Sequence, residues 1–115
     1  MNALTIRLLA TPQAAPMLRH AVREHLGPGS GDAELCVTEL LANVVRHVGE
    51  GTPVTLRVTG TGRAARTRVE LTDPAPGVRP VRREAAGRGL ALVDALAARW
   101  GVTRGARTKT VWCEL

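Results

Sequence analysis

Apolar residues recur along this chain at two spacings, and the shorter spacing predicts strands. Leu4, Ile6 and Leu8 alternate with Thr5 and Arg7, which is typical of a short strand with one buried face. The same alternation predicts further strands at about 54–59, 65–73, 101–105 and 109–115. Glycines at positions 60 and 62 predict a turn that joins the second and third strands as a hairpin.

Spacings of three and four residues predict three helices. The first begins with Thr11 as N-cap and Pro12 at the first helical position, and it ends near Gly27. The second begins near Ser30 or Asp32. Its apolar face repeats at helical spacing through Val37, Leu40, Leu41, Val44, Val45 and Val48. The third helix extends from about 87 to 100.

The order of these elements is β-α-α-β-β-α-β-β. Few strands are separated by a single crossover helix, which excludes a doubly wound parallel sheet. The order favours an α+β fold, a two-layer sandwich in which helices cover one face of a mixed, mostly antiparallel sheet. A chain of 115 residues has the size of one domain, so we expect residues 1–115 to form a single domain.

Composition narrows the class of protein. A hydrophobic fraction of 44% provides a core and excludes disorder. No apolar run approaches the ~20 residues that cross a bilayer, and the first residues lack a signal-peptide pattern, so we expect a cytoplasmic protein without a membrane partner. Cys36 and Cys113 lie far apart in segments of different kinds, which favours buried thiols over a disulfide framework.

The net charge of +6 and the isoelectric point of about 11.2 suggest nucleic-acid binding, but the distribution of the charge does not. The basic residues are scattered arginines, with Lys109 as the only lysine, and the chain has no Phe or Tyr to stack on bases. We therefore expect no direct nucleic-acid partner.

The second predicted helix carries polar residues beside its apolar face. Glu39, Asn43 and His47 fall in one stripe at the flank of that face. Glu39 and Asn43 are four residues apart, so both can reach one ligand. An Asn carbonyl oxygen suits Mg²⁺, and a carboxylate beside the ion could accept a proton from a hydroxyl. The alternative is an ordinary helix with Glu and Asn at its surface.

Asp73 closes the third predicted strand and shares the parity of Val69 and Leu71. If those two residues face the core, Asp73 does so too, and a buried carboxylate needs a hydrogen-bond donor. The exocyclic amine of adenine is a suitable donor. The alternative is a turn or helix-cap aspartate before Pro74.

The segment Gly87-Arg88-Gly89 precedes the third predicted helix. Glycines let backbone N–H groups approach a phosphate closely, and a helix N-terminus favours anions. No Gly-Lys-Ser/Thr follows, so the segment is not a Walker P-loop. A plain loop-to-helix junction is the alternative.

Together and in this order, these segments resemble the motifs of the GHKL, or Bergerat-fold, ATPases, and most closely the anti-sigma-factor serine/threonine kinases. Glu39-Leu40-Leu41-Ala42-Asn43-Val44-Val45-Arg46-His47 resembles the N-box, and Asp73-Pro74-Ala75-Pro76-Gly77 resembles the first glycine box. Gly87-Arg88-Gly89-Leu90-Ala91-Leu92-Val93 resembles the second glycine box, and Lys109-Thr110-Val111-Trp112 resembles the last strand near the nucleotide.

The resemblance implies ATP and Mg²⁺ as cofactors and assigns roles to single residues. Asn43 would hold Mg²⁺, Glu39 would be the general base, and Asp73 would bind the adenine amine. The other nucleotide contacts that it implies are His47, Gly77, Gly87, Arg88, Gly89, Leu90 and Thr110.

The resemblance also implies a function and partners. Such a kinase phosphorylates a serine of an antagonist protein and, in its alternative state, sequesters a sigma factor; relatives are commonly dimers, so a homodimer fits. A second hypothesis is a regulatory module that acts only by binding its partner. Ala75, in place of a glycine of the first box, and the short lid between Asp73 and Gly87 favour it. A third hypothesis, the ATP-binding part of a histidine kinase system, is disfavoured because no dimerisation helix with a phospho-accepting histidine is recognisable.

Overall fold

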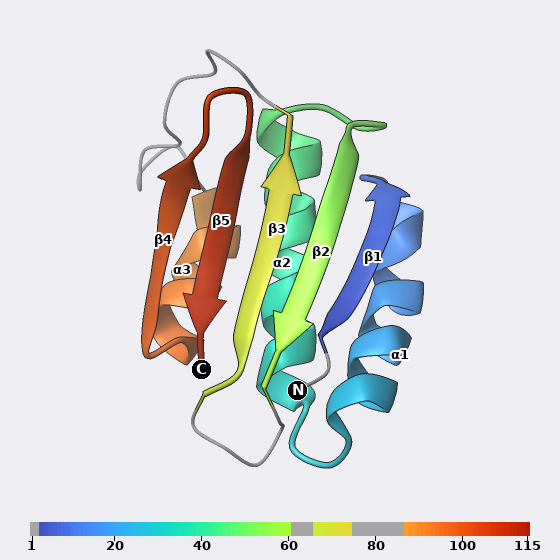
Figure 1. Ribbon diagram of the computed structural model, residues 1–115, viewed down its shortest axis with the longest axis vertical. Helices are drawn as coiled ribbons and strands as arrows, with labels where there is room; N and C mark the ends of the chain where they lie inside the picture. Colours follow the sequence, from blue (N-terminus) through green and yellow to red (C-terminus); the bar gives the residue numbers. More distant parts are fainter. Residues whose placement is uncertain (1–2, 61–65, 75–86) are drawn as a thin grey trace.

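The computed structural model describes residues 3–60, 66–74 and 87–115, and its elements follow the order expected from the sequence (Figure 1). The helices are α1 (Ala15–Leu26), α2 (Gly31–His47) and α3 (Gly87–Leu96). The strands are β1 (Leu4–Leu9), β2 (Pro53–Thr59), β3 (Arg68–Asp73), β4 (Arg99–Arg104) and β5 (Lys109–Glu114). The turn predicted after β2 lies mostly outside the described residues.

The strands form one sheet in the order β1-β2-β3-β5-β4. Every pairing between these strands is antiparallel, so the mixed sheet expected from the sequence was wrong in that respect. The connection through α3 explains the difference. It leads to β4, which has the same direction as β3, but β5 lies between the two strands and pairs with both.

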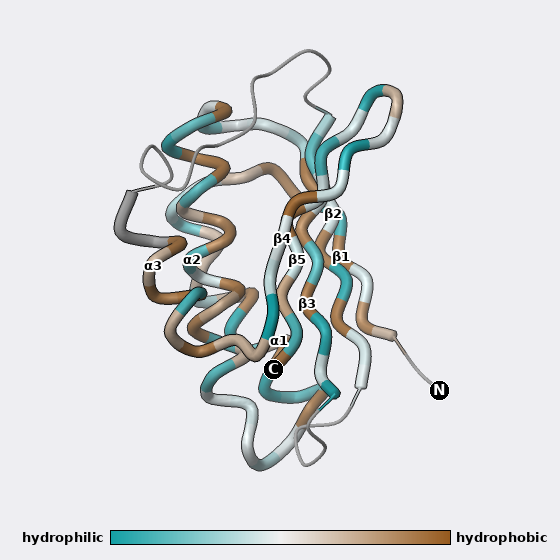
Figure 2. Tube along the Cα trace, turned by 90° about the vertical axis from the view of Figure 1, so that its left-hand side faces the viewer, coloured by the Kyte–Doolittle hydropathy of each residue, from teal (hydrophilic) through white to brown (hydrophobic). Residues whose placement is uncertain are grey.

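The helices cover one face of the sheet, which confirms the two-layer α+β fold (Figure 2). The central helix α2 packs against α1, α3 and β3. Every second residue of a strand points to the face that the helices cover and completes the core there. Leu56, Val69 and Val111 are examples, and all three are buried. The helical spacing of the apolar residues and the period-two spacing in the strands therefore meet in a single core.

Two helix ends differ from the sequence prediction. Thr11 has an extended backbone but makes no side-chain capping bond, and Pro12 opens a 3-10 turn that precedes α1. The helix α3 ends at Leu96, before the predicted end near residue 100. The backbone N–H of Ala98 already donates to the carbonyl of Glu114, because the chain there enters the sheet as β4.

The other face of the sheet, here called the open face, carries polar side chains that are paired with one another. The hydroxyls of Thr72 and Thr110 are 2.7 Å apart and hydrogen-bonded. The guanidinium of Arg68 contacts the carboxylates of Glu70 at 3.1 Å and Glu114 at 2.8 Å, and it lies 4.4 Å from the centre of the Trp112 ring. Polar residues on this face thus satisfy each other across neighbouring strands.

The described helices include no candidate for a membrane-spanning segment. Within residues 3–60, 66–74 and 87–115, no helix combines the length and the apolar character that spanning a bilayer requires.

Candidate functional site

Four elements meet at one end of the molecule, at the top of the view in Figure 1. There α2 and β3 end, and β5 and α3 begin. The helix α2 packs on both β3 and α3, and the register of the sheet pairs Asp73 with Lys109. Residues from distant parts of the sequence are therefore brought together at this end, which we call the site end.

Asn43 lies in the last two turns of α2 and is completely buried, with an exposed fraction of 0%. It is carried on the same side of the helix as Leu40 and Val44, which pack into the core. Neither amide atom of Asn43 has a hydrogen-bond partner in the described part of the chain. Leaving a buried polar group unpaired costs ~1–3 kcal/mol, so this amide is a candidate for a ligand contact.

Asp73 and Lys109 form a second buried polar pair at the site end. Their exposed fractions are 1% and 0%, because strand parity points both side chains under the helices. The Lys109 Nζ lies 3.9 Å from the Asp73 Oδ2, within ion-pair distance but too far for a hydrogen bond. Among residues 3–60, 66–74 and 87–115, neither carboxylate oxygen nor the ammonium has a hydrogen-bond partner.

Burial controls the acidity of this carboxyl group. Removal from water raises the pKa of Asp73 above its ordinary value, while the positive charges of Lys109 and Arg104 oppose the rise. An acceptor that is buried, lacks a donor and has a cation beside it is a strong candidate for a ligand contact.

Sequence reasoning identified Asp73 but missed Lys109 as a site residue. The signal was present, because Lys109 is the only lysine of the chain and shares its strand parity with the buried Val111 and Cys113. What the sequence lacked was the pairing of β3 with β5, which places this lysine opposite Asp73.

Glu39 and His47 extend the stripe of α2 on either side of Asn43. Both residues are partly exposed, in contrast to the buried Asn43. The Nε2 of His47 is buried and, within the described residues, has no hydrogen-bond partner. Glu39 is therefore the more exposed position of the two, and the amide of Asn43 one turn later is buried.

The glycine-rich start of the third helix is placed at the site end as well. Gly87, Arg88 and Gly89 form the first turn of α3. Leu90 follows and is a core residue with an exposed fraction of 2%. Gly77 lies outside the described residues, as does most of the lid between Asp73 and Gly87, so their expected nucleotide contacts stay predictions.

Thr110 is the one described candidate that the structure does not bring to this cluster. It is adjacent to Lys109 in β5 and so points to the opposite face of the sheet. There its hydroxyl is hydrogen-bonded to Thr72. Strand parity thus separates Thr110 from Asn43 and Asp73.

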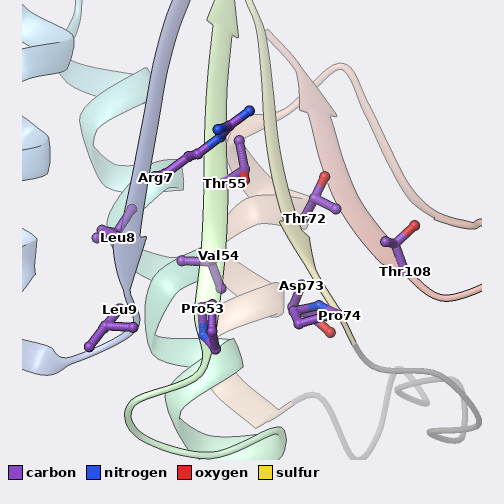
Figure 3. Close-up of a pocket in the computed structure, with 10 residues that line it drawn as sticks. All are labelled: Arg7, Leu8, Leu9, Pro53, Val54, Thr55, Thr72, Asp73, Pro74 and Thr108. Carbon is purple, nitrogen blue, oxygen red and sulfur yellow. The ribbon is translucent and has the colours of Figure 1, made fainter.

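A pocket of about 530 Å³ lies at the ends of β1, β2 and β3 (Figure 3). Arg7, Thr55 and Thr72 line it from the open face, and Asn43 is not among its lining residues. Asp73 also lines this pocket, so the pocket borders the cluster of buried polar groups at that residue, whereas Lys109 is not among its lining residues.

The two cysteines, far apart in the sequence, are neighbours in the core. Both are free thiols and both have an exposed fraction of 0%, which confirms the expectation of buried thiols. The Cys113 thiol donates a hydrogen bond to Cys36 in α2, and this bond together with the loss of water raises the pKa of Cys113 well above its usual range. The same hydrogen bond lowers the pKa of Cys36, and the pair joins α2 to β5 inside the core.

The residues of the site end fit a magnesium ion only together with a phosphate ligand. In the described part of the chain, no group of three or more His, Cys, Asp or Glu side chains is arranged to hold a metal. The unpaired Oδ1 of Asn43 is a hard oxygen of the kind that Mg²⁺ prefers. Because Mg²⁺ keeps several waters and commonly binds substrate phosphates, one protein oxygen is sufficient at such a site.

Comparison with known proteins agrees with this geometry. Residues 8–114 match the family model described as the histidine kinase-like ATPase domain. An uncharacterised protein of Streptomyces coelicolor is 44% identical over 84 residues, which cover 68% of this chain and 79% of that protein.

The fold also has a counterpart among solved structures. The crystal structure of the RsbU and RsbW domains of Rv1364c from Mycobacterium tuberculosis superimposes with a TM-score of 0.70 and 22% sequence identity. The match covers 98% of this chain but only 32% of that one, and at this identity it concerns the fold. The chain belongs to the histidine kinase-like ATPase domain family, in agreement with its resemblance to the GHKL ATPases.

Proposed function

Starting from membership of this ATPase family, we propose that the chain is a cytoplasmic serine/threonine kinase of the anti-sigma-factor type. It binds ATP with Mg²⁺ at the site end and transfers the γ-phosphoryl group to a hydroxyl of an antagonist protein. In its alternative state it sequesters a sigma factor. The RsbW domain in the structural neighbour and the order of the motifs support this specific form.

One observation carries the proposal. Asn43 and Asp73 are buried, lack hydrogen-bond partners within the described residues, and lie on elements that end at the same place. A core that served stability alone would not keep an amide and a carboxylate without partners, because each unpaired group costs free energy. A nucleotide with its magnesium ion supplies what both lack, an amine donor for Asp73 and a cation for Asn43.

The roles follow from the chemistry of each group. Asp73 accepts a hydrogen bond from the exocyclic amine of adenine, and the Oδ1 of Asn43 would hold the metal. When bound, Mg²⁺ neutralises charge on the phosphate oxygens. The backbone N–H groups in the first turn of α3, with Gly87 and Gly89, face the phosphates and benefit from the helix N-terminus.

The transfer itself needs a base for the acceptor hydroxyl. The carboxylate of Glu39 takes the proton while the hydroxyl oxygen forms a bond to the γ-phosphorus and ADP departs as leaving group. Partial exposure suits this role because the hydroxyl belongs to a second protein that approaches from outside.

Incubation with Mg-ATP and candidate antagonist proteins tests the proposal directly. We expect an increase in the intact mass of one antagonist by a single phosphate, on a serine or threonine. The Glu39→Ala variant is expected to keep ATP affinity and lose phosphotransfer, while Glu50→Ala, an exposed carboxylate after α2, leaves both unchanged. Unchanged transfer by Glu39→Ala would remove this residue from the role of base.

The same experiment separates the kinase from a regulatory module. ATP binding without phosphate on any antagonist, together with a stable complex with a partner, would support a module that acts by binding alone. Ala75 in the first glycine box is the sequence feature that favours this second function.

A further inference from the structure

We infer that Lys109 is a specificity-determining residue of the nucleotide site. Its ammonium donates a hydrogen bond to a ring nitrogen of adenine next to the exocyclic amine, while Asp73 accepts from the amine itself. The inference rests on the proposed ATP binding and deepens it, because it concerns how the base is selected.

The position of Lys109 first indicates a function beyond packing. Lysine is almost never fully buried unless its charge is paired, yet here its exposed fraction is 0%. The side chain reaches under the helices at the first residue of β5, at the site end. Its neighbours along the same strand face, Val111 and Cys113, are apolar core residues, so the ammonium is the polar tip of an otherwise apolar row.

The ion pair between Lys109 and Asp73 includes no hydrogen bond. At 3.9 Å the Nζ and the Oδ2 attract each other, but they are about 1 Å beyond the usual hydrogen-bond distance. The Nζ has three N–H donors, and none of them has an acceptor in the described part of the chain. A pair that existed for stability would close this gap, since a buried ion pair is favourable only with good geometry and satisfied donors.

The side chains of Asp73 and Lys109 are together complementary to one edge of adenine. The exocyclic amine of adenine is a donor, and the ring nitrogens N1 and N7 on its two sides are acceptors. A carboxylate next to an ammonium presents the matching acceptor and donor, side by side. Insertion of the base edge would satisfy atoms of Asp73 and of Lys109 in one step, and it would do so in a site shielded from water, where such bonds discriminate most strongly.

A purely structural lysine would neutralise Asp73 and nothing more. It would strengthen or weaken every adenine nucleotide equally and would be insensitive to single atoms of the base. A lysine that contacts a ring nitrogen would instead couple to that nitrogen alone, and this coupling can be measured with a double-mutant cycle between protein and ligand.

Titration calorimetry with ATP, 1-deaza-ATP and 7-deaza-ATP provides the cycle, because each analogue replaces one ring nitrogen by CH. For the unmodified chain we expect one of the two analogues to bind about ten-fold to a hundred-fold more weakly than ATP. For Lys109→Met, which keeps the length and loses the charge, we expect ATP and that analogue to bind with equal affinity. The control Thr110→Val changes the next residue, on the opposite face, and should keep the discrimination.

The outcomes separate this inference from the proposal on which it rests. If ATP binds and both analogues bind as tightly as ATP, Lys109 contacts no ring nitrogen and the inference is wrong. A loss of affinity for an analogue that persists in Lys109→Met overturns it too. No binding of ATP at all would overturn the proposed function as well. If Lys109→Met does not fold, Asp73→Asn/Lys109→Met removes both charges, and the analogues should then match ATP.

Discussion

In the part of the chain that the structure describes, polar side chains of β3 and β5 are hydrogen-bonded on one face of the sheet and lack hydrogen-bond partners on the other. On the open face, Thr72 is hydrogen-bonded to Thr110, and Arg68 is paired with two carboxylates. On the covered face, the next pair in the same register, Asp73 and Lys109, is buried and makes no hydrogen bond within the described residues. One pair of strands thus carries both a satisfied polar network and an unsatisfied one.

The difference is between polar residues that satisfy each other and buried polar residues that lack hydrogen-bond partners in the described part of the chain. Partly exposed groups on the open face can exchange partners with water, so their pairing contributes little and costs little. Buried groups have no such exchange, and a fold keeps them unpaired only at a free-energy cost. Substitutions on one face or the other therefore differ in their expected effects on stability and on ATP affinity.

Lys109→Met should destabilise the nucleotide-free protein more than any change on the open face. Removal of one partner of a buried charge pair costs about 3–5 kcal/mol, because the Asp73 carboxylate keeps its burial and loses its cation. Arg99→Met is the matched control: Arg99 is 71% exposed and is paired with Glu114, so water screens the loss. Urea unfolding at neutral pH measures both, and equal effects would contradict the distinction between the two faces.

Asp73→Asn should weaken ATP binding by about 10–100-fold, which corresponds to the ~1.5–3 kcal/mol of a hydrogen bond to a charged group. The neighbouring Thr72→Val is the control, since it lies on the open face and should leave the affinity unchanged. Calorimetry with ATP gives both values. A normal affinity in Asp73→Asn would show that this carboxylate does not bind the base.

The fold was largely predictable from the sequence because each element carries one clear period. Leu4, Ile6 and Leu8 alternate, and the apolar face of α2 repeats at helical spacing. The burial of Asp73 also followed from strand parity, whereas the stripe at the flank of the apolar face of α2 did not predict the complete burial of Asn43. The antiparallel pairing throughout the sheet did not follow, because the position of β5 between β3 and β4 depends on long-range packing.

Dependence on long-range packing also explains why the sequence did not identify the site residue of β5. Lys109 and Thr110 are adjacent, and the sequence alone does not say which of them faces the helices near Asp73. The resemblance to the family favoured Thr110, while the structure puts Lys109 under the helices. Strand alternation would have shown that Lys109 faces the helices and Thr110 does not, but only if Val111 and Cys113 had been known to face the core.

Thr110→Val tests whether a polar residue of the open face contributes to stability without contributing to ATP binding. The change removes the hydrogen bond with Thr72 at nearly constant volume, so we expect a loss of about 0.5–1.5 kcal/mol in the free energy of unfolding. ATP affinity should not change, since the hydroxyl lies on the open face. A loss of affinity without a loss of stability would return Thr110 to the nucleotide site.

The smallest expected effect is a difference in pH dependence between the two faces. Burial raises the folded-state pKa of Asp73 above its ordinary value of 3.8. The contribution of this group to stability is therefore fully present below that value and is lost as the pH rises through the folded pKa. Relative to Asp73→Asn, the unmodified protein should lose stability over this window when urea unfolding is measured from pH 3 to pH 7.

Glu114 on the open face should show the opposite sign. Hydrogen bonds from Arg99 and Arg68 lower the pKa of its carboxyl below the ordinary value of 4.5. Its contribution is therefore present above pH 4.5 and is lost as the pH falls through the folded pKa, so the unmodified protein should gain stability relative to Glu114→Gln as the pH rises. Two carboxylates on opposite faces of one sheet would then respond to acid in opposite directions, because water and arginines surround one and the core surrounds the other. If both carboxylates changed stability with pH in the same direction, the Asp73 carboxylate would already have a donor in the nucleotide-free protein. It would then not be an acceptor kept for a ligand.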